Sequence, residues 1–335
     1  MRKNFWSVCL VFVLAVGLVV SMSFSAQAKT EWKMCLGDAE GGTQWECGLQ
    51  FAELMNAYTG GDVVIHLFPN GQLGSEQETV QNCRLGTLDY AVVAINNITP
   101  FSKTVGLFTL PYLILSLDEA VTLTQGPIGQ GLVQNTIRDA GVRILSWAYS
   151  GFRVMTNSKR PVRTLEDLKG LVIRVPKNAI MIASYKSWGI NPTPMAWNET
   201  FTALQQKVVD GQDNPYLTNY VMKFYEVQKY VTNIRYIFSL QPLIMGEKLF
   251  QSQSPAMKKT ILRAAKDATE HARQFNVLTI SKVQKLLKDK GMEIMDPANN
   301  EKEWIEKATT AVWPAFYEDI GGKEKIAEAI KAVGR

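Results

Sequence analysis

Histidine and cysteine, the side chains that most often bind zinc, are scarce in this 335-residue sequence. There are two histidines and four cysteines, and no two cysteines have the C-x-x-C spacing of a zinc site. His66 lies in a strand-like run and His271 lies on a charged helix, so we interpret both as structural. We therefore predict neither a metal site nor a cofactor.

A strong charge of one sign is also missing. The formal net charge is +5, and it falls to +3 without Arg2 and Lys3, which belong to the N-terminal segment discussed below. No basic stripe with interleaved aromatic residues, the pattern typical of nucleic-acid binding, occurs in the sequence. We therefore exclude a nucleic-acid partner, whereas a slight positive balance is compatible with an anionic ligand.

Motifs of the common enzyme classes are absent as well. The chain has no G-x-S-x-G elbow, no P-loop and no G-x-G-x-x-G after a strand. The spaced glycines at 126–131 are interrupted by Pro127 and lack an acidic residue that would bind a ribose, so we interpret them as a loop. Asp210 and Asp213 are candidates for a general base by residue type only, because they lie among turn residues. We predict that the protein is not an enzyme.

Only one long apolar run is found, at residues 5–20. Arg2 and Lys3 precede it, and Ser25-Ala26-Gln27-Ala28 follows it with small residues at the positions that a signal peptidase reads. The run is about 16 residues long, short of the roughly 20 needed to span a bilayer. We predict a signal peptide over residues 1–28, cleaved after Ala28, and an exported mature protein.

Three cysteines, Cys35, Cys47 and Cys83, remain after cleavage. An oxidising compartment permits one disulfide and leaves one thiol over. The spacing does not decide which two cysteines pair.

The first part of the mature chain alternates between strand-like and helix-like segments. This alternation predicts a parallel, doubly wound α/β sheet. Ligands bind such sheets beyond the carboxyl ends of the strands, which places the loop 37–44 and the segment 95–97 near a site. We expect strands at 32–36, 63–68 and 90–94, with helices at 45–58 and 75–85.

The same alternation continues in the second part of the chain. About 307 mature residues suit two lobes better than one small core. A helical pattern from Pro255 to Lys290 exceeds the usual length of a globular helix, so we expect it to brace both lobes. Further strands are expected at 143–149, 171–175 and 236–245, and further helices at 164–170, 179–188, 198–207, 220–225, 302–319 and 323–333.

Arg153, Arg174 and Asn214 are the strongest candidates for a binding site. Arg174 ends an apolar run and is followed by Val175 and Pro176. Apolar neighbours are a costly setting for a guanidinium unless an anion meets it. Its planar fork of donors matches a carboxylate, sulfonate or phosphate edge. The alternative is an ion pair with an Asp or Glu of the protein itself.

Trp197 stands apart from the other aromatic residues of the chain. It follows Pro192 and Pro194 in a segment that cannot be helical at its prolines, and it precedes a helix. We expect this side chain to line a cavity.

The order of the motifs resembles that of the periplasmic solute-binding proteins of tripartite ATP-independent periplasmic (TRAP) transporters, of the DctP type. The resemblance covers nearly the whole mature chain. The matching segments are PNGQLG (69–74), GTLD (86–89), LPY (110–112), GFR and TNS (151–158), DLKGLVIRVP (167–176), NPTPMA (191–196), VDGQDNP (209–215) and YEVQKY (225–230).

This resemblance implies a two-lobed, class II-like binding-protein fold with a long helix spanning both lobes. The lobes would comprise residues 29–151 plus 240–279 and residues 152–239 plus 280–335. It implies that Arg174 takes the acidic group of a ligand, with the other site residues nearby: Arg153, Asn214, Trp197, Asn97 and the loop from Gly37 to Glu40. It also implies a monomer that delivers its ligand to DctQ-like and DctM-like membrane subunits, driven by a sodium gradient.

Departures from the family pattern point to a small organic anion. Trp197 is bulkier than the Phe common in sugar-acid binders, and Lys177 stands where a small polar residue is frequent. We expect a sulfonate such as isethionate, or a short carboxylate, with Lys177 as a further donor. Uronic or aldonic sugar acids and C4-dicarboxylates are the alternatives. A periplasmic ligand-sensing subunit of the same fold is the alternative of another class.

Overall fold

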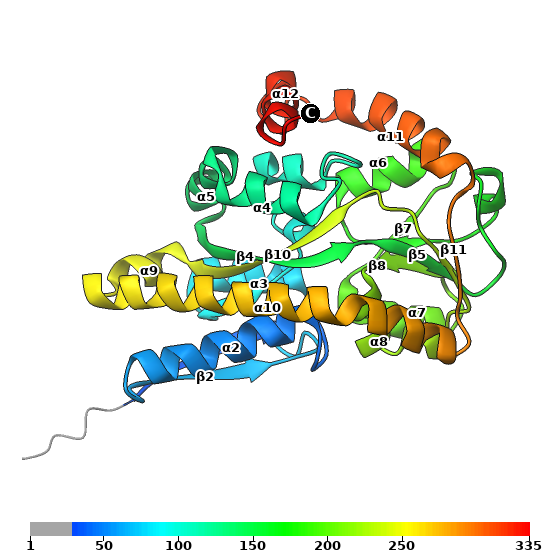
Figure 1. Cartoon of the computed structure of the whole chain (residues 1–335). Helices are drawn as coiled ribbons and strands as arrows, with labels where there is room; N and C mark the ends of the chain where they lie inside the picture. Colours follow the sequence, from blue (N-terminus) through cyan, green and yellow to red (C-terminus); the bar gives the residue numbers. More distant parts are fainter. Residues whose placement is uncertain (1–28) are drawn as a thin grey trace, which may run out of the picture.

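The computed structural model describes residues 29–335, so the predicted signal peptide lies outside the described residues. Two sheets dominate an α/β architecture, with helices packed around both (Figure 1). Up to the point where the chain leaves the first sheet, the elements are β1 (Thr30–Leu36), α2 (Thr43–Tyr58), β2 (Val63–Phe68), α3 (Glu76–Leu85), β3 (Tyr90–Val92), η1 (Ile95–Asn97), η2 (Lys103–Thr109), α4 (Leu117–Gln125), α5 (Pro127–Ala140) and β4 (Val142–Phe152).

The second part of the chain builds a smaller sheet and then returns to the first. Its elements are β5 (Val154–Asn157), η3 (Glu166–Leu168), β6 (Arg174–Val175), α6 (Ala179–Ser187), β7 (Thr193–Pro194), η4 (Trp197–Glu199), α7 (Thr200–Gln205), β8 (Gly211–Asn214), α8 (Tyr216–Val221), η5 (Phe224–Glu226), β9 (Tyr230–Thr232), β10 (Phe238–Gly246), α9 (Glu247–Ser252), α10 (Pro255–Asp289), β11 (Glu293–Met295), η6 (Ala298–Glu301), α11 (Lys302–Ala315) and α12 (Lys323–Ala332).

The first sheet has the strand order β2-β1-β3-β10-β4, and the second has the order β11-β9-β5-β8. Strand β1 pairs in parallel with β2 and β3, but β10 runs antiparallel to both β3 and β4. The parallel pairing expected for the first three strands is confirmed, and the sheet as a whole is mixed because of β10. The reason is that β10 comes back from the second sheet and enters the first from the opposite direction.

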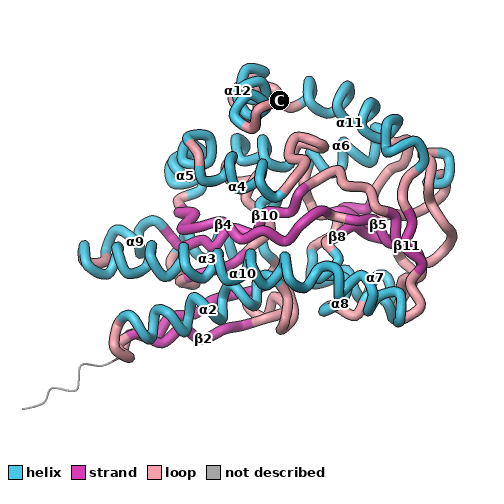
Figure 2. Tube along the Cα trace, viewed as in Figure 1, coloured by secondary structure: helices cyan, strands magenta, loops and turns pink. Residues whose placement is uncertain are grey.

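Strands β4 and β5 connect the two sheets with a single residue between them. Strand β4 ends at Phe152 in the first sheet and β5 begins at Val154 in the second, so Arg153 lies at the crossing. The tube in Figure 2 shows these strands following one another from one sheet to the other. The backbone N–H of Arg153 donates to the carbonyl of Ile237, just before the returning strand β10 (N–O 3.0 Å). The crossing is therefore a two-stranded connection.

Helix α10 runs alongside both sheets, as expected for a long bracing helix (Figure 1). Ser254 caps its first turn and Pro255 occupies the first helical position, where a missing N–H costs nothing. Its first half packs Ile261 and Ala265 into the core beneath the first sheet. Its second half packs Val283 and Leu287 against the second sheet. One rigid element thus contacts both halves of the molecule.

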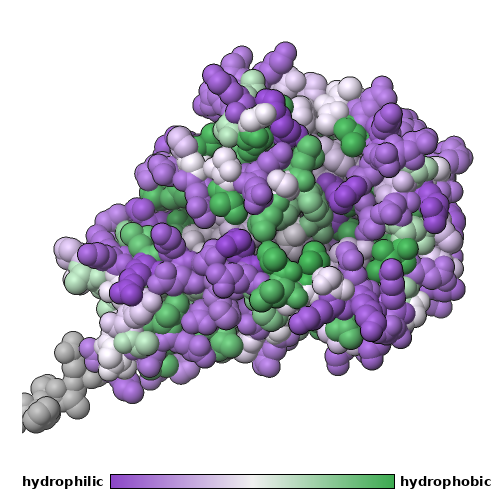
Figure 3. All heavy atoms as spheres, viewed as in Figure 1, coloured by the Kyte–Doolittle hydropathy of each residue, from purple (hydrophilic) through white to green (hydrophobic). Residues whose placement is uncertain are grey.

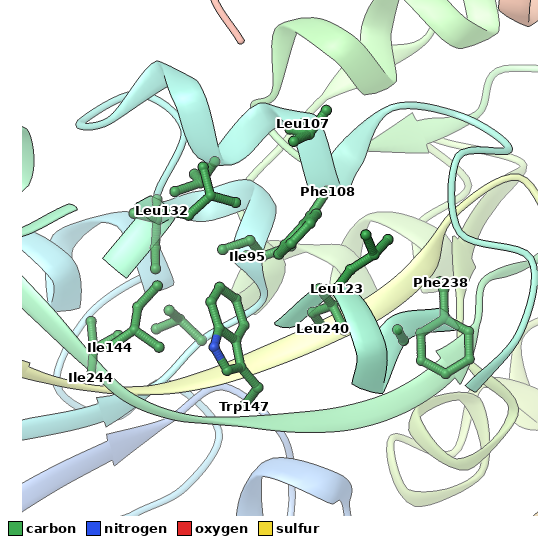
Figure 4. Close-up of a cluster of buried hydrophobic side chains, with 14 of the residues drawn as sticks. Ile95, Leu107, Phe108, Leu123, Leu132, Ile144, Trp147, Phe238, Leu240 and Ile244 are labelled. Carbon is green, nitrogen blue, oxygen red and sulfur yellow. The ribbon is translucent and has the colours of Figure 1, made fainter. Parts of the chain in front are cut away.

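The largest apolar core lies between the first sheet and helices α4 and α5. Figure 4 shows Trp147 of β4 facing Phe108 of η2, with Ile95 and Leu123 beside them. The rings of Phe108 and Trp147 meet edge to face with centroids 5.8 Å apart. This packing holds η1 in position, and η1 forms one wall of the site described below.

Several sequence-based expectations were wrong in detail. Pro127 is the first residue of α5 rather than part of a loop, because a proline at that position stabilises a helix start. The expected strand 171–175 is reduced to Arg174–Val175, since Gly170 is left-handed and Val172 is 40% exposed. Cys35, Cys47 and Cys83 are all buried and free, so the expected disulfide is not formed.

The face of the molecule seen in Figure 3 is mostly hydrophilic. An apolar hollow of about 760 Å³ beside α10 is an exception, and it is lined by residues such as Phe152, Phe238 and Ile280. Among residues 29–335, no helix is both long and apolar enough to cross a membrane.

Candidate functional site

A pocket of about 300 Å³ lies between the two sheets and combines buried charges of both signs. Its walls come from the loops after β1 and β3, from the first turn of α3, and from the crossing strands and β6 to β8. The lining residues are Asp38, Gln44, Glu76, Ala94, Asn96, Asn97, Arg153, Arg174, Pro176, Trp197, Asn214 and Gln241. The carboxyl ends of β1 and β3 thus point at the pocket, as a doubly wound sheet predicts.

Arg174 is buried but has no carboxylate partner within the described part of the chain. Its side chain is 2% exposed, and its Nε and Nη2 both donate to the carbonyl of Met195, at 3.1 and 2.7 Å. Its guanidinium carbon lies 5.6 Å from the ring centroid of Trp197, in cation–π geometry. Burial, together with the neighbouring charge of Arg153, lowers the pKa of Arg174 to about 10. The guanidinium is still charged at neutral pH, and a bound anion would stabilise it.

Arg153 is paired inside the protein. Its Nε donates to Oδ2 of Asp213 at 2.9 Å, and its Nη2 donates to the Asp213 carbonyl. The hydroxyl of Tyr236 donates to the same carboxylate. Burial opposes the charge of Arg153, but Asp213, Tyr236 and Tyr185 together more than offset this effect and raise the pKa of Arg153. The internal ion pair, considered above as the alternative for an arginine of this kind, therefore holds for Arg153.

Asp213 shows why the interpretation as a turn residue was wrong. It belongs to β8, whose residues 211–214 pair with β5, and its side chain is fully buried. Its neighbour Asp210 accepts from the backbone N–H of Val172 at 3.0 Å, so it fixes the segment before β6. Both carboxylates stabilise structure around the arginines.

Two buried carboxyl groups, those of Glu76 and Asp38, face the pocket from the first sheet. Glu76 accepts from Gln44 Nε2 at 2.7 Å and from the backbone N–H of Ala94 at 3.0 Å, and its other oxygen accepts from Asn97. Burial raises the pKa of Glu76, and these hydrogen bonds offset part of the effect. Burial, with the nearby charge of Glu76, raises the pKa of Asp38 to about 7.

Asn214 lies at the end of β8, where its Nδ2 donates to Oε1 of Gln212 at 2.6 Å. Its carbonyl accepts from Nδ2 of Asn219 at 3.0 Å. These bonds hold the amide of Asn214 at the pocket wall together with the arginines.

Trp197 connects the two sides of the pocket. Its Nε1 donates to the carbonyl of Gly37, which follows β1, at 3.1 Å. Phe224 supports the indole ring edge to face, with centroids 5.6 Å apart. The other ring face is available to Arg174. This side chain therefore combines a wall of the pocket with a hydrogen bond across it.

A second pocket, also of about 300 Å³, adjoins the first at Glu76, Asn97, Arg174 and Trp197. Lys177 lines this second pocket, and its carbonyl accepts from Gln77 Nε2 at 3.0 Å, a further bond across the gap. Within residues 29–335, no three histidine, cysteine, aspartate or glutamate side chains are grouped closely enough to hold a metal ion.

The structure thus brings together most of the residues singled out from the sequence. Arg174, Arg153, Asn214, Trp197 and Asn97 line the first pocket, and Lys177 lines the second. Glu40 is exposed and lines neither pocket, because the loop after β1 turns inward at Asp38 and outward again beyond it.

Two polar residues of the first pocket, Glu76 and Gln241, lie outside every segment that the sequence placed near a site. Asp38 and Gln44 were not singled out individually, but both fall within the segment 37–44 already expected near a site, and Gln44 belongs to the first turn of α2. Glu76 resembles an ordinary acidic residue in the first turn of a helix capped by Ser75. Gln241 lies in a strand that is buried along its whole length. Only the pairing of this strand with β4 shows on which face of the sheet the side chain of Gln241 lies.

Comparisons with known proteins agree with this architecture. Residues 39–319 match the family described as bacterial extracellular solute-binding protein, family 7. A solute-binding protein of Verminephrobacter eiseniae is 34% identical over 89% of this chain and 88% of its own length.

Two solved structures are similar over nearly their whole length. A TRAP periplasmic solute-binding protein from Polaromonas sp. JS666, bound to D-erythronate, has a TM-score of 0.84 and 30% identity, covering 90% of this chain and 98% of that one. The sugar acid-binding protein of Advenella mimigardefordensis, in complex with galactonate, has a TM-score of 0.87 and 28% identity, covering 91% and 98%. The chain therefore belongs to family 7 of the bacterial extracellular solute-binding proteins, with their two-lobed fold.

Proposed function

We propose that the protein binds a small organic acid in the pocket between its sheets and delivers it to a TRAP transporter. The observation that supports this most is the buried, positively charged Arg174, whose hydrogen bonds go to a backbone carbonyl instead of a carboxylate. A buried guanidinium without an anion is unfavourable by several kcal/mol, on the order of the cost of breaking a buried ion pair. A ligand carboxylate supplies the missing charge in a geometry that suits the guanidinium fork.

The ligand is proposed to be a short carboxylate. D-Erythronate and galactonate, the ligands of the two similar structures, are monocarboxylates of four and six carbons. A sulfonate such as isethionate has no support from the relatives reported above, so we place it behind the carboxylates.

Binding is proposed to close the cleft. The ligand would contact Arg174 of β6 on one side and the loop after β1 on the other, beside the Trp197–Gly37 hydrogen bond that already bridges the two sides. Exclusion of water strengthens the attraction between the guanidinium and the anion, because the local dielectric constant falls. The closed form would dock on the membrane subunits by a shift in the open–closed equilibrium.

The remaining expectations belong to this proposal. The lobes would be residues 29–151 plus 240–279 and residues 152–239 plus 280–335. The protein would act as a monomer in the periplasm after removal of residues 1–28, with DctQ-like and DctM-like membrane subunits as partners.

A thermal-shift and calorimetry panel on residues 29–335 tests the proposal. The panel contains D-erythronate, galactonate, glucuronate, succinate, pyruvate, taurine and isethionate. We expect one or more carboxylates to raise the melting temperature and to bind with 1:1 stoichiometry. Failure of every anion in the panel to bind, or turnover of one of them by the purified protein, would contradict the proposal.

A further inference from the structure

Two polar atoms at the pocket have no hydrogen-bond partner in the described structure. They are Oδ2 of Asp38 and Nδ2 of Asn96, and the two side chains are only 3% and 4% exposed. Buried polar atoms are almost always paired, because an unpaired one forfeits its bonds to water without replacing them. Both side chains belong to residues that line the first pocket.

The other buried carboxyl group of the pocket is, by contrast, fully engaged. Glu76 accepts hydrogen bonds from Gln44, Ala94 and Asn97, so both of its oxygens are used by the protein. The backbone of Asp38 is also held, since its N–H contacts Gln44 Oε1 at 3.3 Å and its carbonyl accepts from Asn70 at 3.1 Å. The fold therefore fixes the position of Asp38 but leaves its carboxyl oxygen Oδ2 without a partner.

These two atoms require complementary chemistry from a ligand. Above its pKa of about 7, Asp38 is ionised and only accepts hydrogen bonds, and the Nδ2 group of Asn96 only donates them. An alcohol hydroxyl can do both, so a hydroxylated carbon chain satisfies the two side chains together. A methylene group satisfies neither, and a second carboxylate on the ligand would meet the like charges of Asp38 and Glu76.

We infer that Asp38, assisted by Asn96, is the specificity-determining residue that selects hydroxylated monocarboxylates over dicarboxylates of the same length. This inference rests on the proposed function, because it assigns the uncharged end of a ligand whose acidic end binds Arg174. The two ends are held by different parts of the fold. Arg174 comes from β6, and Asp38 and Asn96 come from the loops after β1 and β3.

Three four-carbon acids separate the contributions in a calorimetric comparison on residues 29–335. D-Erythronate has one carboxylate and three hydroxyls, succinate has two carboxylates, and butyrate has one carboxylate and no hydroxyl. We expect erythronate to bind at least 100-fold more tightly than either of the others. Tighter binding of succinate than of erythronate would overturn the inference and leave the proposed function intact, whereas failure of all organic acids to bind would defeat the proposed function.

The variant Asp38→Asn keeps the shape of the side chain and removes its charge. We expect it to lower the affinity for erythronate at least tenfold and to leave the affinity for succinate unchanged or increased. Glu40→Gln is the matched control, since it makes the same change of charge on an exposed residue of the same loop. An erythronate-to-succinate ratio that is the same in Asp38→Asn, Glu40→Gln and the wild type would refute the assignment.

Asn96→Ala provides an independent variant in case Asp38→Asn does not fold. It removes the unpartnered donor, and we expect erythronate affinity to fall about five- to tenfold while butyrate affinity is unchanged. Equal losses for erythronate and butyrate would indicate a purely structural role for Asn96 and would contradict the inference.

Discussion

Arg153 and Asp213 form a fully buried ion pair at the crossing between the two sheets, with 2.9 Å between Nε and Oδ2 and side chains no more than 3% exposed. Arg174, in the same pocket, has no such partner in the described structure. Two arginines that look alike in the sequence thus have different electrostatic states. One is neutralised by the protein, and the other is the residue that we propose binds the acidic group of the ligand.

Replacement of Asp213 by Asn is expected to destabilise the fold strongly. It leaves the Arg153 guanidinium buried without a counter-charge, which typically costs about 3–5 kcal/mol. Urea denaturation of residues 29–335 measures the loss. Glu328→Gln, which breaks the exposed Lys325–Glu328 pair, serves as the control and should change stability by about 0.5 kcal/mol or less. Equal effects of the two substitutions would contradict the assigned role of the buried pair.

Replacement of Trp197 by Phe is expected to speed ligand release. Phe keeps an aromatic ring beside Arg174 but cannot donate to the carbonyl of Gly37 across the pocket. Loss of one hydrogen bond of about 1 kcal/mol corresponds to a roughly fivefold faster dissociation. Stopped-flow measurement of ligand dissociation tests this prediction.

Trp313→Phe is the matched control for Trp197→Phe. It removes a similar indole bond, to the carbonyl of Pro111 at 2.9 Å, from a residue that lines neither pocket. Dissociation should not change in this variant. Identical rates for Trp197→Phe and the wild type would show that the hydrogen bond between Trp197 and Gly37 does not hold the cleft closed.

The ligand-free protein is expected to lose stability as the pH rises from 4 to 7. Burial raises the pKa of Asp38 from 3.8 to about 7, with Glu76 adding to the shift and Arg153 opposing it. Over this range the folded protein retains a proton that the unfolded chain releases, so stability falls with pH by up to about 1.4 kcal/mol per unit. Asp38→Asn should flatten this part of the profile, as measured by urea denaturation at several pH values. A profile unchanged in that variant would contradict the pKa of Asp38.

The three cysteines of residues 29–335 are expected to be free thiols that react only on unfolding. Burial raises the pKa of Cys47 to about 12 and raises the pKa of Cys83 further, so thiolate is scarce at neutral pH. Mass spectrometry after treatment with a maleimide should show three additions in denaturant and almost none in buffer. A protein that requires prior reduction to show three additions would contain a disulfide and would contradict the structure.

The residues that line the pocket could be predicted from the sequence more readily than the residues that pair with them inside the fold. Arg174 was predictable because an arginine that ends an apolar run is conspicuous, and α10 was predictable because its helical pattern extends without a break to Gly291. The loops at the ends of β1 and β3 followed from strand–helix alternation alone.

The remaining features depend on tertiary contacts that the local sequence does not show. Asp213 lies in a stretch rich in turn formers, and only pairing of β8 with β5 buries it against Arg153. Glu76 has the appearance of a helix-start residue, and only the packing of α3 directs it toward Ala94 and Asn97. Pairing of cysteines likewise depends on distances in the fold, so the spacing of the cysteines in the sequence could not decide whether a disulfide forms.

Isothermal titration calorimetry of Arg174→Ala is the most direct test of the account. With the tightest-binding acid of the panel, we expect affinity to fall at least 100-fold, because the ligand anion loses the one buried arginine of the pocket that has no carboxylate partner in residues 29–335. Arg174→Lys should recover only part of the loss, since an ammonium group lacks the planar fork of donors. Undiminished affinity in Arg174→Ala would contradict the proposal that this residue receives the acidic end of the ligand.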